Sequence, residues 1–505
     1  MQKTVSQRKV GVILSYGSEA VQILSGLIYT PIMLRILGQS EYGLYQLVHS
    51  IVAYMSLFSL GFGSSYIRFY SRYKAKDDYE EIARLNGMFM TIFSAIAIIC
   101  LVCGIGLVTN IESVLGGGLT ESELATARIL MIFMVVNMAV SFPASVFNCY
   151  VTSQEKFIFQ KGLIFLQRIL NPFLALPLLL VGFGSVGMVL VTTVLTFAAF
   201  LSSVWYCVKK LKIRFLFNGF RFSSLKEMWA FTFFIFLNQI IDQINWNLDK
   251  YLLGRMVGTT GVAIYSLGAQ INTMYMQFST SISNVFAPKV NRIVAETNDN
   301  KALSELFSRI GRVQFIILSL ALSGFIVFGK PFMTFWGGEG YEKSYGIALL
   351  LIGPATVPLI QNIGLEIQRA KNMHKARSVV YLAVVLANIG LSVYLIRTLG
   401  VSGAAIGTAV SVTAGTIVFM NWYYHFRIGL DIVMFWKNIA KLIPAVMLSL
   451  AFGVIMCRFV SIHNVLILGI CIGAYTVVFC FAMWFLGMNQ YEKQLFGSFL
   501  KRNKR

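Results

Sequence analysis

The chain has 505 residues, of which 57% are hydrophobic and only 12% are Asp, Glu, Lys or Arg. Soluble proteins carry roughly 25% charged residues, so this composition excludes a soluble globular protein. Many apolar runs exceed about 18 residues, which indicates a polytopic membrane protein. The formal net charge of +21 would suggest nucleic acid in a soluble chain. Here the basic residues fall in short loops between apolar runs, so we expect a positive membrane face and no nucleic-acid partner.

The apolar runs predict an all-α fold with about fourteen membrane-spanning helices. In chain order their approximate ranges are 10–34, 44–67, 86–109, 127–151, 157–181, 185–208, 228–253, 262–287, 310–334, 344–368, 378–397, 402–424, 439–459 and 464–486. The N-terminus is basic and then apolar, which we interpret as an uncleaved first span that starts in the cytoplasm. With that orientation most of the 42 Lys and Arg residues lie on the cytoplasmic side, and both termini are expected there.

Two halves of the chain resemble each other. When Tyr45 is aligned with Tyr265, ILGQSEYGLYQL (Ile36–Leu47) lies over MVGTTGVAIYSL (Met256–Leu267), and Gly38 lies over Gly258. The pattern predicts two six-helix lobes related by an axis along the membrane normal, followed by two additional helices. We therefore expect an N-lobe with a cytoplasmic linker at 1–220, a C-lobe at 221–426, and the last two helices with a basic cytoplasmic tail at 427–505.

A polar stripe runs along the helix predicted at 228–253. It consists of four side chains at steps of four, three and four residues, with a lysine beside the last: Asn238, Asp242, Asn245, Asp249 and Lys250. Residues at this spacing share one helical face. A charge at mid-bilayer costs about 2.5–3.5 kcal/mol on insertion scales, so the stripe is expected to line a protein-enclosed interior rather than lipid. The alternatives are a coupling or substrate-orienting carboxylate, or a structural polar seam.

The first half offers weaker counterparts. The helix at 10–34 carries Glu19, Gln22 and Ser25 on or near a polar face, and Arg168 lies deep in the helix at 157–181. Because transporters commonly bind substrate between repeats near the midplane, we expect these residues and the stripe of 228–253 to line a central cavity. Asp242, Asp249 and Glu19 are the candidates for ion coupling. A buried Arg keeps its charge, so Arg168 requires water, a carboxylate or an anionic substrate.

Motifs of enzyme chemistry are lacking. The sequence has no GxSxG, no phosphate-binding loop and no cluster of His and Cys with metal-ligand spacing. We therefore expect no enzymatic activity, no cofactor and no metal. Movement of a substrate would have to be driven by an ion gradient, with a proton or sodium, or by the substrate's own gradient.

Three motifs resemble a known family. RILGQSEYGLYQL after the first helix, LGFGSSYIRFYSRY at the end of the second, and LDKYLLGRMVGTTGVAIYSLGAQ resemble the polysaccharide-transporter branch of the superfamily that includes the MATE exporters. The resemblance implies two lobes that open alternately to either side of the bacterial cytoplasmic (inner) membrane. The implied cargo is an undecaprenyl-diphosphate-linked oligosaccharide for surface polysaccharide synthesis, with Arg168 as the deep candidate for the diphosphate.

The same resemblance argues against one specific role and offers one alternative function. Related lipid II flippases are expected to carry arginine on the cavity face of the first helix, where this chain has Ser15, Ser18, Gln22 and Ser25, which argues against a peptidoglycan role. The alternative is an ion-coupled multidrug or metabolite antiporter of the MATE type on the same architecture. In either case we expect a monomer whose partners are its substrate, a coupling ion and membrane lipids.

Overall fold

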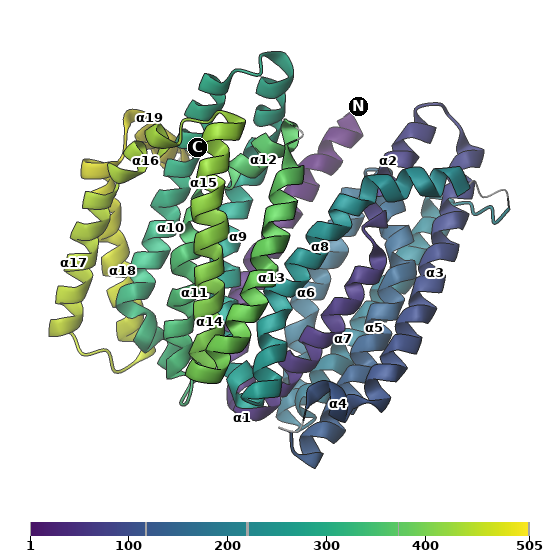
Figure 1. Ribbon diagram of the computed structural model, residues 1–505, viewed down its shortest axis with the longest axis horizontal. Helices are drawn as coiled ribbons and strands as arrows, with labels where there is room; N and C mark the ends of the chain where they lie inside the picture. Colours follow the sequence, from purple (N-terminus) through teal and green to yellow (C-terminus); the bar gives the residue numbers. More distant parts are fainter. Residues whose placement is uncertain (1, 117–118, 219–221, 372, 503–505) are drawn as a thin grey trace. The chain divides into compact units, whose positions relative to one another are not determined.

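The computed structural model describes residues 2–116, 119–218, 222–371 and 373–502, and every regular element within these ranges is a helix (Figure 1). The predicted all-α polytopic class is therefore confirmed. Eleven helical stretches among the described residues are long and apolar enough to cross a membrane, and the first of them, at 13–74, covers two of the predicted spans. The number of fourteen spanning helices stays a prediction.

The chain divides into two compact units, Met1–Ala263 and Ile264–Arg505. The first unit extends beyond the expected N-lobe, because α8 (Phe222–Met256) packs against α1 (Gln2–Ala53) and α2 (Phe62–Lys74). The predicted boundaries at 220/221 and 426/427 describe repeats rather than packing, and they stay predictions.

The first unit is a bundle of long helices that pack side by side (Figure 1). Pairs in extensive contact are α1 with α6, α3 with α5, and α7 with both α5 and α6. The elements between α2 and α8 are α3 (Tyr79–Thr109), α4 (Ile111–Leu115), α5 (Glu121–Ser153), α6 (Phe157–Leu180) and α7 (Gly184–Trp205). This packing places the deep polar residues of α1 beside those of α6 and α7.

Glycine bends the chain at corresponding points of the predicted repeat. Gly38 interrupts α1 with φ 72° and ψ 178°, so this long helix consists of two helices that meet at a kink. Gly258 lies between α8 and α9 (Thr259–Glu296) with φ 98°. Positive φ values are accessible to glycine without steric cost. The two glycines that the sequence aligns thus both have positive φ where two helical segments meet, and the repeat itself stays a prediction.

The second unit is built around α10 (Asn300–Gly337), which packs against α11, α16, α17 and α18. In addition, α14 packs against both α13 and α11. The bounds of the other elements are α11 (Glu342–Ile360), α12 (Ile363–Ala370), α13 (His374–Leu399), α14 (Val401–Val412), α15 (Met420–Tyr423), α16 (Ile432–Ala440), α17 (Ile443–Phe459), α18 (Val465–Ala482) and α19 (Gln490–Arg502).

Large apolar side chains cover much of the surface. Phe459, Leu466 and Phe173 are 83%, 77% and 73% exposed, and many other Ile, Val and Leu residues of the spanning helices are similarly exposed. Such surfaces are rare on soluble monomers and are favourable when acyl chains replace water. The exterior of the spanning helices is therefore apolar, whereas polar residues are held inside.

Candidate functional site

A polar cavity of about 500 Å³ lies within the first unit, between α1, α6 and α7. Three of the predicted site residues, Gln22, Ser25 and Arg168, line it. The full lining is Gln22, Ser25, Tyr29, Gln167, Arg168, Asn171, Pro172, Thr192, Leu195 and Thr196. Helical spacing explains the grouping, because Gln22, Ser25 and Tyr29 follow one another at steps of three and four on α1.

The charge of Arg168 is balanced by an acid from α1. One guanidinium nitrogen, Nη1, donates to Oε1 of Glu19 over 3.1 Å, and both side chains are partly exposed, at 28% and 40%. Two charges that are unfavourable alone at this depth thus support each other. A guanidinium has five N–H donors, and in the described part of the chain only the bond to Glu19 is recorded for Arg168. Arg168 can therefore hold Glu19 and still donate to an anion.

Polar contacts between α6 and α7 shape the cavity wall. Gln167 donates from Nε2 to the carbonyl oxygen of Leu195 over 3.2 Å, and Asn171 donates from Nδ2 to the hydroxyl of Thr192 over 3.1 Å. Gln167, Asn171, Thr192 and Thr196 were not predicted from the sequence as site residues. The available signal was their helical spacing, since Asn171 lies three residues after Arg168 and the two threonines are four apart.

The stripe of α8 has an exposed part and a buried part. Asp242 and Asn245 are exposed and Asn238 is half-buried, whereas Asp249 is only 3% exposed. Lys250, beside Asp249, donates from Nζ to Oε1 of Gln46 on α1 over 3.4 Å. The four predicted residues share a helical face, but the end nearest α9 is the part enclosed by protein.

Further polar bonds fix α8 in the first unit. Gln243 donates from Nε2 to the hydroxyl of Ser56 over 3.0 Å, and Asn247 donates to Oε1 of Gln243 over 2.7 Å. Nearby, a Cβ at Gly254 would lie 2.4 Å from a methyl carbon of Leu47, so the helices approach each other closely there. The α8 group thus packs on the second part of α1 and on the 3-10 turn Tyr54–Ser59, whereas the Arg168 cavity adjoins the first part. That both groups face one central cavity stays a prediction.

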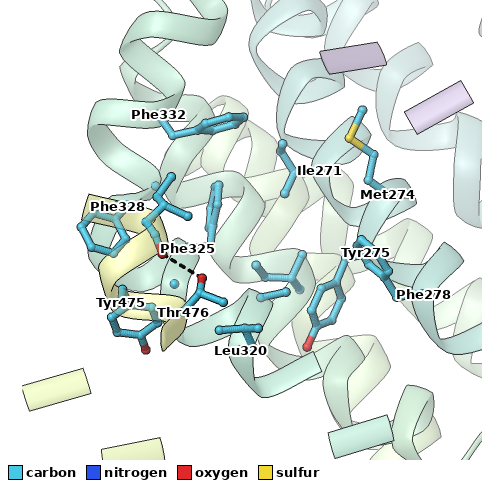
Figure 2. A pocket seen from close by; sticks show the side chains of 15 residues that line it. Ile271, Met274, Tyr275, Phe278, Leu320, Phe325, Phe328, Phe332, Tyr475 and Thr476 are labelled. Atoms are coloured by element: carbon cyan, nitrogen blue, oxygen red, sulfur yellow. Dashed lines mark hydrogen bonds between the residues drawn. The ribbon is translucent and has the colours of Figure 1, made fainter. Parts of the chain in front are cut away.

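An apolar pocket of about 290 Å³ occupies the second unit between α9, α10, α11 and α18 (Figure 2). Aromatic rings of Phe325, Phe328 and Phe332 line it from α10, and Tyr475 lines it from α18. The hydroxyl of Thr476 is used within its own helix, where it donates to the carbonyl oxygen of Ile472 over 2.7 Å. The pocket therefore offers almost purely apolar surface.

Comparison with known proteins gives a family match over more than half of the chain. A family model described as "Polysaccharide biosynthesis protein" matches residues 9–294. A putative O-antigen transporter of Shigella flexneri is 22% identical over 408 residues, which are 77% of this chain and 91% of the relative. A probable flippase of Haloferax volcanii, AglR, is 26% identical over 175 residues, which are 34% of this chain and 36% of the relative.

Solved structures share the fold. The lipid II flippase MurJ in an inward closed conformation aligns with a TM-score of 0.73 at 14% identity, covering 93% of this chain and 98% of that one. A multidrug resistance transporter of the MATE family in an inward-facing conformation aligns with a TM-score of 0.62 at 15% identity, covering 83% and 96%. The spanning helices, the family match and the transporter relative together identify a multi-pass protein of the cytoplasmic membrane.

Proposed function

Because the chain belongs to the polysaccharide biosynthesis protein family, we propose that it is a flippase that moves undecaprenyl-diphosphate-linked oligosaccharides across the bacterial cytoplasmic membrane by alternating access. The general part of this proposal is that the protein transports lipid-linked glycans and is not a catalytic enzyme. It rests on the family and its transporter and flippase relatives. The specific part of the proposal is that the lipid carrier is undecaprenyl diphosphate and that the protein works by alternating access.

The observation that carries the proposal is the cavity around Arg168. A lipid-linked glycan has a diphosphate between its sugar and its lipid, and this anion has to pass the low-dielectric core. Arg168 supplies a permanent charge there, and its planar fork of donors matches phosphate oxygens. Gln22, Asn171 and the threonines of α7 supply hydrogen-bonding groups suited to sugar hydroxyls.

The lipid part of the substrate needs a different surface. The pocket in the second unit is lined by aromatic and aliphatic side chains (Figure 2), and we assign it as a contact for part of the polyprenyl chain. Its occupation would bury apolar surface at about 25 cal/mol per Å².

Coupling to an ion gradient is assigned to the acids Asp242, Asp249 and Glu19, with a proton or sodium as the ion. Asp249 is enclosed and has Lys250 as its neighbour, so a change in its charge would alter local packing. Asp242 is exposed and accessible to an ion. Glu19 is held by Arg168, which links any change in its charge to the anion site.

The test is complementation of a strain that lacks the gene. We expect the deletion to lose surface polysaccharide and to accumulate lipid-linked units in the inner leaflet. Arg168→Ala should fail to restore export at normal protein level, and Arg168→Lys should restore it partly because it keeps the charge but loses the fork. Glu19→Gln is compared with Arg168→Ala. A purely structural ion pair should lose protein level equally from either side, whereas functional roles in coupling and in anion binding should lower export at normal protein level.

A multidrug or metabolite antiporter is the competing function, and the MATE-type fold is common to both. It predicts drug resistance on overexpression that depends on Asp242 or Glu19, with unchanged surface glycan in the deletion strain. Normal export from both Arg168→Ala and Asp242→Asn would contradict the site assignment.

A further inference from the structure

A second polar pocket lies in the other unit, at the end where α10 begins. It has a volume of about 590 Å³ and is enclosed by the first turns of α10, by α16, and by the segment that joins α18 to α19. The charge bias of the loops predicts that this end is cytoplasmic. None of the residues of the proposed glycan site belongs to it.

The floor of this pocket is a rigid polar network. Arg312 is 5% exposed, and it donates from Nε and Nη2 to the two carboxylate oxygens of Glu492 over 2.6 and 2.9 Å. Nη2 also donates to the carbonyl oxygen of Gly487 over 2.9 Å, and Nη1 donates to that of Asn438. The side chain of Asn438 in turn donates to the hydroxyl of Ser308 over 3.0 Å. A fully bonded network of this kind holds the walls in one arrangement.

The walls carry cations whose charge this network does not neutralise. Arg309 is exposed and its guanidinium lies 4.6 Å from the ring centre of Tyr491. Lys441 is exposed and makes a long bond, 3.4 Å, to Oδ1 of Asn438. Among the described residues, Glu305 is the carboxylate that lines the pocket with them, and the nearby Glu492 is paired with Arg312. Two cations against one acid favour an anionic ligand.

The rim of the pocket is apolar and belongs to the ends of membrane-spanning helices. Leu486 lines the pocket and is 58% exposed, and Phe485 beside it is 70% exposed. Both lie in the spanning stretch at 465–487. On the other wall, Met434 of α16 lines the pocket and is half-buried, and its neighbour Val433 is 54% exposed. Exposed apolar residues next to Lys, Arg and Tyr are typical of the boundary between acyl chains and headgroups.

We propose that this pocket binds the phosphate headgroup of an anionic phospholipid of the cytoplasmic leaflet, with Arg309 and Lys441 as its donors. The acyl chains of that lipid lie against Phe485, Leu486 and Val433. Basic pockets between spanning helices on this side are suited to such lipids. A free phosphate would satisfy the two cations but would leave the apolar rim uncovered, and for this reason the lipid is the assigned source.

The experiment measures lipid binding to the purified full-length protein in a neutral detergent, by native mass spectrometry and by thermal unfolding. Phosphatidylglycerol is compared with phosphatidylcholine and with inorganic phosphate. A charge near the membrane surface contributes about 1 kcal/mol, or roughly a fivefold change in Kd. We expect phosphatidylglycerol to bind and to raise the unfolding temperature. Arg309→Gln and Lys441→Gln should each weaken binding about fivefold, and the double variant about 25-fold.

Lys437→Gln is the matched control, because Lys437 is an exposed cation of α16 that does not line the pocket. It should bind like the unchanged protein. Equal weakening by Lys437→Gln would assign the binding to general surface charge and overturn the proposal. Equal stabilisation by inorganic phosphate would overturn the lipid as the source, and equal binding of phosphatidylcholine would overturn recognition of an anion. Because the three side chains are exposed, the variants are expected to fold, which gel filtration checks.

Discussion

The ion pair between Arg312 and Glu492 gives a prediction whose size follows from its burial. The two side chains are 6% and 0% exposed and are joined by two short bonds. Glu492 also accepts from the backbone N–H of Asn489, while its own N–H donates to Asn489 Oδ1 over 2.9 Å, which caps the start of α19. Glu492→Gln therefore removes the counter-charge of a buried guanidinium. Loss of one partner of such a pair costs about 3–5 kcal/mol.

The cost should appear first in α19, because this helix is the last element of the described chain and the pair anchors it to α10. Hydrogen exchange of the α19 amides measures the free energy of local opening. A loss of about 3–5 kcal/mol corresponds to exchange that is faster by roughly two to four orders of magnitude. Glu305→Gln, at an exposed acid of α10, is the matched control and should leave α19 unchanged.

A double variant separates the pair from the packing around it. Arg312→Met with Glu492→Leu removes both charges, and replacement of a buried pair by apolar residues is often neutral. Protection of α19 should then return toward its original level. Unchanged exchange in Glu492→Gln would refute the argument that this pair holds α19, and additive losses in the double variant would refute direct coupling of the two charges.

Three further predictions concern the first unit. A Cβ at Gly43 would lie 1.9 Å from the carbonyl oxygen of Thr259, so Gly43→Ala should lower the unfolding temperature of the purified protein or abolish its accumulation. Glu41 accepts from the N–H and the hydroxyl of Ser185 over 2.6 and 2.7 Å at the start of α7; Glu41→Ala should cost about 1 kcal/mol in thermal unfolding, as loss of a helix cap does. Asp249→Asn should abolish export at normal protein level if this acid couples transport, whereas an unchanged export rate would exclude that role.

The fold was largely predictable because a membrane simplifies the sequence pattern. Long apolar runs indicated the spanning helices, and the structure is helical throughout its described residues. The predicted repeat stays a prediction, and the structure adds that the two glycines aligned by sequence, Gly38 and Gly258, both take positive φ. Because a positive φ favours glycine, such a position can be recognised from the sequence without coordinates.

The site was predictable only in part, because its geometry depends on contacts between distant helices. Helical spacing identified Gln22 and Ser25, and the position of a charge deep in a predicted span identified Arg168; all three line one cavity. Neither signal gave an indication that Glu19 is the partner of Arg168, since their approach requires α1 to pack on α6. The pairing of Arg312 with Glu492 was hidden for the same reason: 180 residues separate them.

Transfer of lipid-linked glycan in reconstituted vesicles is the direct test of flippase activity. The purified protein is inserted into liposomes that contain an undecaprenyl-diphosphate-linked glycan in both leaflets, and a membrane-impermeant reagent follows the units that become accessible outside. We expect transfer above that of protein-free vesicles, and its loss in Arg168→Ala. Transfer no faster than in protein-free vesicles, with the protein folded and inserted, would contradict this expectation.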